Sequence, residues 1–427
     1  MTQKISAHCS LKKPFRRLGW IYWLAGASAF CAEAPLPHQA YVWQREWNAP
    51  VREAVSAHAA VYAETAVLVA EVLWKDKLPQ VARAGVDFAT LAETHRPIGI
   101  VLRVGPFKGD LAADKMAVNF LTELASSLVA EARKNKIEPA ELQIDFDCAE
   151  ARLDDYREWL KAVQQRVAPL PVTITALPSW LNSPAFARLS AMATNYVLQV
   201  HSLHRPTEIS APFTLCDPAE ARRAVEHAGK IGVPFRVALP TYGYLVAFNA
   251  AGKFSGLAAE APRAGWPEGT QLREMRADPL TMSSLVRMWN TNRPAALRGV
   301  IWYRLPVAVD NLNWRWPTLG AIVAARVPSE KFSAVAQPVE PGLMEISLIN
   351  DGELDISSRL VIDLRWSEGR LVAGDGLRGF ELAEAKNSSV ELKNQSASFR
   401  LPAGEKMVVG WLRFEANREV QLEVKKF

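Results

Sequence analysis

The spacing of apolar positions divides the chain into three parts. From residue 38 to about residue 327, short apolar runs alternate with longer segments, such as 114–134 and 154–167, in which apolar residues recur every three or four positions. The short runs are typical of buried strands, and the longer segments of amphipathic helices. Eight strands are predicted here, at 40–46, 66–74, 97–104, 142–147, 171–177, 196–201, 235–240 and 299–304.

Eight strands separated by helices over residues 38–327 predict an α/β fold class, a (β/α)8 TIM barrel. One helix start is marked by Asp217 followed by Pro218, an N-cap residue before a proline at the first helical position. An open doubly wound sheet is the alternative. Such sheets usually carry a glycine-rich first turn of the GxGxxG kind, and the sequence contains none.

The last part of the chain loses the helical period. Prolines at 328, 338 and 341 predict a linker over 328–341. Beyond it, apolar and polar residues alternate, which predicts a small β-sandwich over 342–427. Its strands are expected at 345–350, 359–366, 389–392, 398–401, 406–414 and 419–424.

The first 34 residues predict a secretory signal peptide. Lysines and arginines precede an apolar run over 18–32 that ends in small residues and is short for a membrane-spanning helix. The chain is therefore expected to be exported, periplasmic or secreted, with no stable transmembrane span after cleavage. A lipid anchor at Cys31 is the less favoured alternative, because Phe30 is large for the position before a lipidated cysteine.

Charge and cysteine content narrow the chemistry. The formal charge is +5, of which residues 1–34 supply +4, so the remainder carries only 5 − 4 = +1 and no nucleic-acid partner is expected. Beyond the signal, Cys148 and Cys216 allow one disulfide or two buried free thiols. The sequence shows no Cys/His cluster, so neither a metal site nor a cofactor is predicted. His201 and His204 are interpreted as unrelated side chains.

Two carboxylates close the predicted fourth strand of the barrel. In the alternating run 142–147, Asp145 and Asp147 share one strand face while Ile144 and Phe146 share the other. Two acids on one face are costly to bury, which favours a catalytic or ligand-binding pair at the barrel mouth. The alternative is a solvated turn in which the aspartates cap the following helix.

Function in TIM barrels collects at the carboxyl ends of the strands, and polar and aromatic residues gather at those ends here. Such residues are typical of a carbohydrate cleft that takes a polysaccharide or oligosaccharide ligand. Asp147, expected to lie deeper in the charge cluster of the mouth, is the candidate acid, with Asp145 as its partner and Glu71 as a more distant base. Core packing is the alternative for each tryptophan. The predicted ligand-binding residues are Trp43, Arg103, Trp180, Gln199, His201, Tyr242, Trp302 and Tyr303.

With these motifs the chain resembles a bacterial family known as domain of unknown function 3142. The residues that carry the resemblance are 142–148, Tyr156, 173–181 and 240–243, and it spans the barrel over 38–325. The resemblance implies an exported barrel similar to glycosidases.

A broader similarity is to the chitinase-like barrels of glycoside hydrolase family 18, whose fourth strand reads D-x-x-D-x-D-x-E. Asp145 and Asp147 match the second and third aspartates, whereas Leu142 stands at the first and Ala149 at the acid. The family's tyrosine on strand six is also missing, near Gln199. The lysozyme-like barrels of family 25 carry D-x-E on the same strand, which 145–147 fits with a shorter acid.

Two functions therefore remain open. The first is an exported glycoside hydrolase-like protein that acts on an envelope or extracellular polysaccharide. The second is a non-catalytic glycan-binding or envelope-assembly protein on a hydrolase-like barrel. It is suggested by Ala149, which stands where family 18 has its acid.

Overall fold

The computed structural model describes residues 34–75, 78–107, 109, 114–259, 265–396 and 399–426. The predicted signal peptide lies outside these residues except for Ala34. None of the helices in the described ranges is long and apolar enough to cross a membrane.

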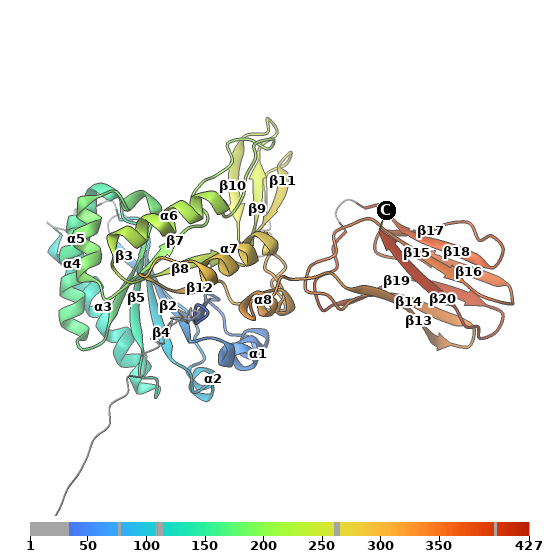
Figure 1. Cartoon of the computed structure of the whole chain (residues 1–427), viewed down its shortest axis with the longest axis horizontal. Helices are drawn as coiled ribbons and strands as arrows, with labels where there is room; N and C mark the ends of the chain where they lie inside the picture. Colours follow the sequence, from blue (N-terminus) through green and yellow to red (C-terminus); the bar gives the residue numbers. More distant parts are fainter. Residues whose placement is uncertain are drawn as a thin grey trace, which may run out of the picture. The chain divides into compact units, whose positions relative to one another are not determined.

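The first domain is a closed barrel of eight parallel strands, which confirms the predicted fold class (Figure 1). Each strand pairs in parallel with the next around the barrel, and the first strand pairs with both the second and the last. The strands are β1 (His38–Val42), β2 (Glu64–Lys75), β4 (Ile98–Val104), β5 (Glu141–Phe146), β6 (Val172–Ala176), β7 (Tyr196–Gln199), β8 (Phe235–Pro240) and β12 (Leu297–Tyr303).

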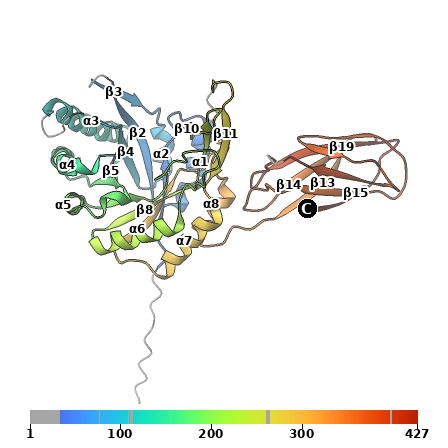
Figure 2. The same ribbon diagram turned by 90° about the horizontal axis from the view of Figure 1, so that it is seen from above.

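Helices surround this barrel, and α3, α4 and α5 lie side by side on one flank (Figure 2). Asp217 caps α6 as predicted, because its side chain accepts hydrogen bonds from the backbone N–H groups of Ala219 and Glu220. The helices are α1 (Ala49–His58), α2 (Phe88–Glu93), α3 (Lys115–Lys134), α4 (Leu153–Val167), α5 (Pro184–Met192), α6 (Pro218–Ile231), α7 (Pro279–Thr291) and α8 (Trp316–Val323), with 3₁₀ turns at Ala59–Val61, Glu150–Arg152 and Pro178–Trp180.

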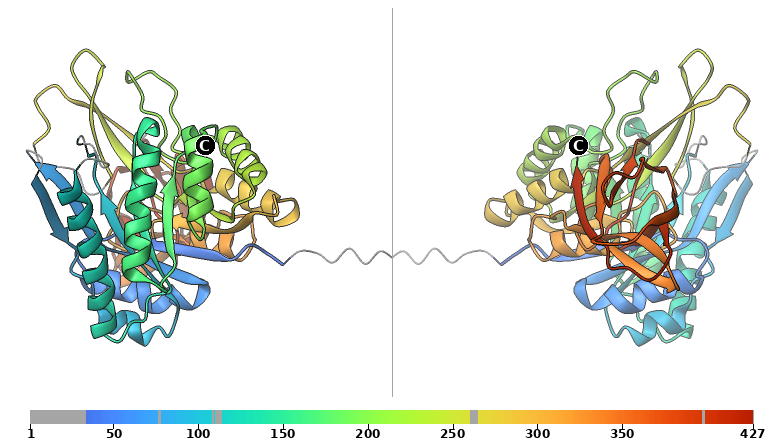
Figure 3. Two further views of the ribbon diagram at one scale, coloured as in Figure 1. Left: turned by 90° about the vertical axis from the view of Figure 1, so that its left-hand side faces the viewer. Right: turned by 90° about the vertical axis from the view of Figure 1, so that its right-hand side faces the viewer.

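Two additions to the barrel were not predicted. β3 (Leu78–Arg83) forms an antiparallel hairpin with the far end of β2. After β8 the chain forms a separate antiparallel sheet of β9 (Gly243–Phe248), β10 (Phe254–Ala258) and β11 (Gln271–Arg276), with β9 in the middle. This sheet projects from the barrel (Figure 3).

The C-terminal domain consists of two four-stranded antiparallel sheets that share one hydrophobic core. The expected strand at 398–401 is reduced, in its described part, to one bridge between Leu401 and Ile356. The sheets are β13 (Phe332–Glu340), β14 (Leu343–Asn350), β19 (Lys406–Phe414) and β16 (Leu371–Gly376), and β17 (Phe380–Leu382), β18 (Ser389–Asn394), β15 (Leu360–Arg365) and β20 (Gln421–Lys426).

The segment expected to be a linker needs correction. β13 occupies most of 328–341 and pairs with β14 along its length. Pro338, the one proline within β13, does not prevent pairing, because β13 is an edge strand of its sheet.

Side chains alternate across the barrel wall as the sequence predicts. On β5, Leu142, Ile144 and Phe146 belong to the apolar layer beneath the helices. Gln143 and Asp145 face the interior, where Gln143 bonds with Tyr41 and Asp145 reaches the cavity at the mouth. The interior is thus unusually polar at this strand.

Candidate functional site

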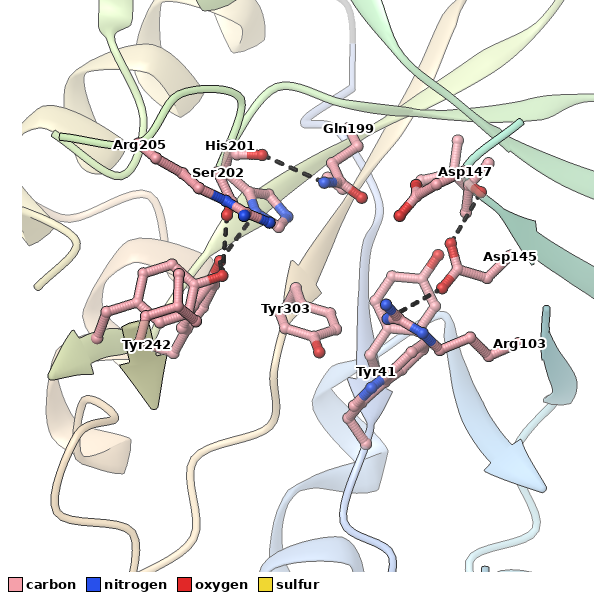
Figure 4. Close-up of a pocket in the computed structure, with 16 residues that line it drawn as sticks. Tyr41, Arg103, Asp145, Asp147, Gln199, His201, Ser202, Arg205, Tyr242 and Tyr303 are labelled. Atoms are coloured by element: carbon pink, nitrogen blue, oxygen red, sulfur yellow. Dashed lines mark hydrogen bonds and ion pairs between the residues drawn. The ribbon is translucent and has the colours of Figure 1, made fainter. Parts of the chain in front are cut away.

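A cavity of about 310 Å³ opens at the carboxyl ends of the barrel strands (Figure 4). Asp145, Asp147 and Arg103 lie on one side of it, and His201, Arg205 and Tyr242 on the other. The remaining lining residues are Tyr41, Trp43, Thr175, Val197, Gln199, Ser202, Ala238, Tyr244, Leu257 and Tyr303.

Asp145 is the buried carboxylate of the pair, with only 8% of its surface exposed. Its Oδ1 accepts a hydrogen bond of 2.9 Å from the Thr175 hydroxyl, and its Oδ2 lies 3.5 Å from the Arg103 guanidinium. Burial raises the pKa of Asp145 above its ordinary value, Arg103 opposes that shift, and the neighbouring Asp147 adds to it. Asp145 is thus held in one orientation by two donors.

Asp147 differs from the expectation that it lies deeper in the mouth. It is exposed, because β5 ends at Phe146 and the next residues leave the sheet. Among the described residues it forms neither a hydrogen bond nor an ion pair, although its charge acts on Arg103. This carboxylate is therefore available to form a hydrogen bond with a ligand in the cavity.

Glu71 does not reach the cavity. Its carboxylate lies between two arginines, 3.3 Å from Arg103 Nε and 2.8 Å from the Arg45 guanidinium. Glu71 is not among the residues that line the cavity, so its carboxylate does not contact a ligand bound there. The structure thus gives Glu71 a supporting position behind Arg103 instead of the base position predicted for it.

Aromatic rings form much of the cavity wall. The Tyr303 ring lies 5.1 Å from that of Trp43 and 5.3 Å from that of Tyr242, both nearly edge-on, and it stacks on His201 at 5.5 Å. Burial raises the pKa of Tyr242 well above its ordinary value, and lowers the pKa of His201 to about 3. Both side chains are therefore neutral near pH 7, with the tyrosine a hydrogen-bond donor.

Two predicted ligand-binding tryptophans belong to the core instead. Trp180, 1% exposed, packs toward Phe186 beneath the helices. Trp302 is fully buried on the outer face of β12, and its indole N–H donates to His38 Nδ1 at 3.0 Å. Trp302 precedes the inward-facing Tyr303, so strand alternation places it on the opposite face.

Eight residues of the cavity lining were missed from the sequence, among them the small or apolar Val197 on β7 and Ala238 on β8. Tyr41 could have been found, because it lies two positions before Trp43 on the same strand face. Thr175 and Thr173 likewise lie two positions apart on β6 and form the polar face of that strand. The others, Ser202, Arg205, Tyr244 and Leu257, come from a loop and from the unpredicted sheet, where no periodic signal exists.

Cys148 and Cys216 are free and buried, so the structure has two thiols and not the disulfide that the sequence also allowed. Burial raises the pKa of each thiol to about 12, which leaves them protonated and unreactive near pH 7. Within the described ranges, no group of three or more His, Cys, Asp or Glu side chains is placed to hold a metal ion.

Eight parallel strands closed into a barrel, with a ligand-sized polar cavity at their carboxyl ends, define the class as TIM-barrel proteins with a site at the barrel mouth. Within this class, the chain belongs to the family described as "Domain of unknown function (DUF3142)", whose model matches residues 94–308. Residues 333–415 match a second model, "Domain of unknown function (DUF8456)". No curated protein matches the chain in sequence.

Several solved structures resemble the chain. Chitinase ChiA74 from Bacillus thuringiensis is 10% identical, with a TM-score of 0.44 over 92% of this chain and 100% of that one. A chitinase from Chromobacterium violaceum is 14% identical, with a TM-score of 0.48 over 68% of this chain and 98% of that one. The Bacillus cereus spore cortex-lytic enzyme SleL is 12% identical, with a TM-score of 0.49 over 68% and 74% of the two chains.

Proposed function

We propose that the chain is an exported glycoside hydrolase-like protein that binds an envelope or extracellular polysaccharide at the barrel mouth and cleaves it. The observation that carries the proposal is the asymmetric carboxylate pair. Asp145 is buried and held by Thr175 and Arg103, while Asp147 stands uncommitted at the edge of the same aromatic-lined cavity.

The two environments suit two roles. Burial raises the pKa of Asp145, and the paired Arg103 opposes that rise and favours the ionised form, in which the carboxylate can stabilise positive charge that develops on a sugar ring. Asp147 is solvated in the free protein. A sugar bound in the cavity would lie against Asp147, which places this carboxyl group where a general acid donates a proton to the glycosidic oxygen.

The cavity's size and lining fit one sugar unit. A volume of about 310 Å³ lies at the lower end of ligand pockets. Trp43, Tyr242 and Tyr303 offer ring surfaces for sugar C–H groups, while Gln199 and Ser202 offer hydrogen bonds to hydroxyl groups.

A second candidate function is glycan binding without turnover. Both carboxylates of the cavity lie at the end of β5, and the lining residues from β7, β8 and β12 carry none. Ala149 occupies the position that corresponds to the acid of family 18. A pocket whose carboxylates all lie on one side is compatible with binding as well as with cleavage.

Hydrolysis of a polysaccharide panel by the mature chain tests these two functions. Replacing Asp147 by Asn is expected to lower kcat by about 10²- to 10⁴-fold, because general acid catalysis contributes about that much. The exposed Glu150, three positions further on, supplies the matched control Glu150→Gln, which should retain activity. Equal turnover by Asp147→Asn would reject Asp147 as the acid, and affinity without any turnover by the unaltered chain would establish the binding function instead.

A further inference from the structure

A second and larger cavity adjoins the mouth cavity. Its volume is about 630 Å³, and it lies between the ends of β6 and β7 and the start of α6. The two cavities share Asp147, Gln199 and Ser202, so a ligand can pass from one into the other along these three side chains. Asp147 therefore stands between two binding spaces.

Arginines without acidic partners line both spaces. Arg205 points into the mouth cavity in Figure 4, and Arg223 on α6 lines the second cavity. Both are exposed, and within the part of the chain that the structure describes neither forms an ion pair. By contrast, Arg188 on α5 is neutralised by Asp154 at 2.7 Å.

Neither carboxylate that lines the second cavity forms an ion pair with Arg223 in the described part of the chain. Apart from the shared Asp147, its lining includes one carboxylate, Glu220, and this lies 3.0 Å from His204 Nε2. His227 adds a further nitrogen base. The other side of the cavity is apolar, formed by Leu177, Pro178, Leu181 and Leu203.

We propose that the second cavity is a subsite for an acidic sugar, so that the substrate class is a carboxylate-bearing polysaccharide. One sugar unit occupies the mouth cavity, and its neighbour lies past Asp147 with its ring against the leucines and its carboxylate toward Arg223. Arg205 receives an acidic group on the first unit. The inference rests on the proposed glycan-binding function and adds the charge of the ligand.

Arginine suits this task because its planar guanidinium binds a carboxylate through two parallel hydrogen bonds. A pair at an exposed site is weak by itself, and one made at the edge of an apolar cavity is stronger. Loss of Arg223 is therefore expected to weaken binding of an acidic oligosaccharide about three- to tenfold.

Calorimetric titration of the mature chain tests the inference. The ligands are oligogalacturonates, the same oligosaccharides with their carboxyl groups reduced, and sulfated neutral oligosaccharides of equal length. The unaltered chain should bind the oligogalacturonate more tightly than the reduced form, and this preference should decrease as salt is raised.

Arg223→Gln should reduce the preference about three- to tenfold, with the remainder due to Arg205, and leave affinity for the reduced oligosaccharide unchanged. Arg222→Gln is the matched control, because Arg222 is exposed on the same helix and lines neither cavity. Equal affinity for charged and reduced ligands would overturn the acidic subsite while leaving glycan binding intact. Preference for the sulfated ligand alone would overturn the carboxylate assignment, and no binding of any glycan would overturn both proposals.

Discussion

The barrel interior contains an arginine–carboxylate cluster at each end, and the two clusters differ in how completely they are closed. At the amino end, Arg236 is 6% exposed and donates to both oxygens of Glu141 at 2.7 and 2.9 Å. It also donates to Gln39 at 2.6 Å and to Asn195 at 3.0 Å. Arg236 and Glu141 are both buried, and the side chains of this cluster bond to one another.

At the carboxyl end, the Arg103 side chain is 34% exposed and its two ion pairs are longer, at 3.3 and 3.5 Å. The guanidinium also lies 5.9 Å from the Trp43 ring. The same residue types thus serve different purposes. The closed cluster stabilises the barrel, and the open cluster keeps charge and hydrogen-bonding capacity available at a cavity.

Hydrogen bonds connect the two ends. The Tyr41 hydroxyl donates to Gln143 Oε1 at 2.8 Å, and the Gln143 amide donates to Glu141 in the lower cluster. The Tyr41 ring in turn meets the rings of Trp43 and Tyr303 at the mouth. The lower cluster therefore positions one aromatic residue of the cavity.

Replacing each arginine by methionine should give the largest contrast. Arg236→Met leaves Glu141 buried without its cation, which is expected to cost about 3–5 kcal/mol of unfolding free energy. Arg103→Met should cost less than Arg236→Met, because Asp145 keeps its hydrogen bond from Thr175 and Glu71 keeps its ion pair with Arg45. Denaturant unfolding measures both. If Arg236→Met fails to fold, Arg236→Met with Glu141→Gln should recover part of the loss; equal costs for the two single variants would contradict the comparison.

The lower cluster should also make stability depend on pH. Burial beside Glu141 raises the pKa of Glu64 to about 8, so the folded chain retains a proton that the unfolded chain has lost. Stability is therefore expected to fall as pH rises from about 4.5 to about 8. The pKa values of His38 and His201 are lowered to about 4 and 3, which gives the opposite slope below their ordinary value of 6.5.

Between pH 6.5 and 8 these histidines lose their remaining protons in the unfolded state and their opposing contribution fades, so Glu64 gives the main slope among these groups. Unfolding free energy should decline there by roughly 2 kcal/mol, at 1.36 kcal/mol per pH unit for one proton. Glu64→Gln cannot titrate and should show no such decline over the same window. A slope that persists in Glu64→Gln would mean that another group is responsible.

Gly99 on β4 makes room for the lower acid pair. A Cβ at this position would lie 2.5 Å from Glu64 Oε1 and 3.2 Å from Glu141 Cγ. Gly99→Ala is expected to cost about 1–3 kcal/mol through overpacking. Gly85→Ala is the matched control, since its Cβ would meet only the Arg45 carbonyl oxygen at 3.7 Å. Similar melting temperatures for the two variants would show that the acid pair tolerates displacement.

The barrel was predictable because each of its strands is a short apolar run between turn residues, and Asp145 was predictable because it shares a face with Gln143. The alternation of side chains along a strand could not predict the position of Asp147, because β5 ends at Phe146, one residue earlier. Trp302 and Tyr303 were both assigned to the mouth, although adjacent residues of one strand face opposite ways.

The projecting sheet escaped prediction for another reason. β11 reads Gln-Leu-Arg-Glu-Met-Arg, and most of its residues are partly or fully exposed, so it has no buried apolar face to detect. Arg205 and Ser202 lie on the loop after β7, whose course depends on contacts distant in sequence. Such residues are found only when the fold brings them together.

The sheet of β9, β10 and β11 can change in sequence without affecting the strand pairing that stabilises the barrel. It contributes Tyr244 and Leu257 to the cavity wall, yet its strands pair only with one another and with no barrel strand. Relatives could therefore exchange or lengthen this excursion and acquire a different ligand preference, while the eight-stranded closure and its lower cluster remain as they are.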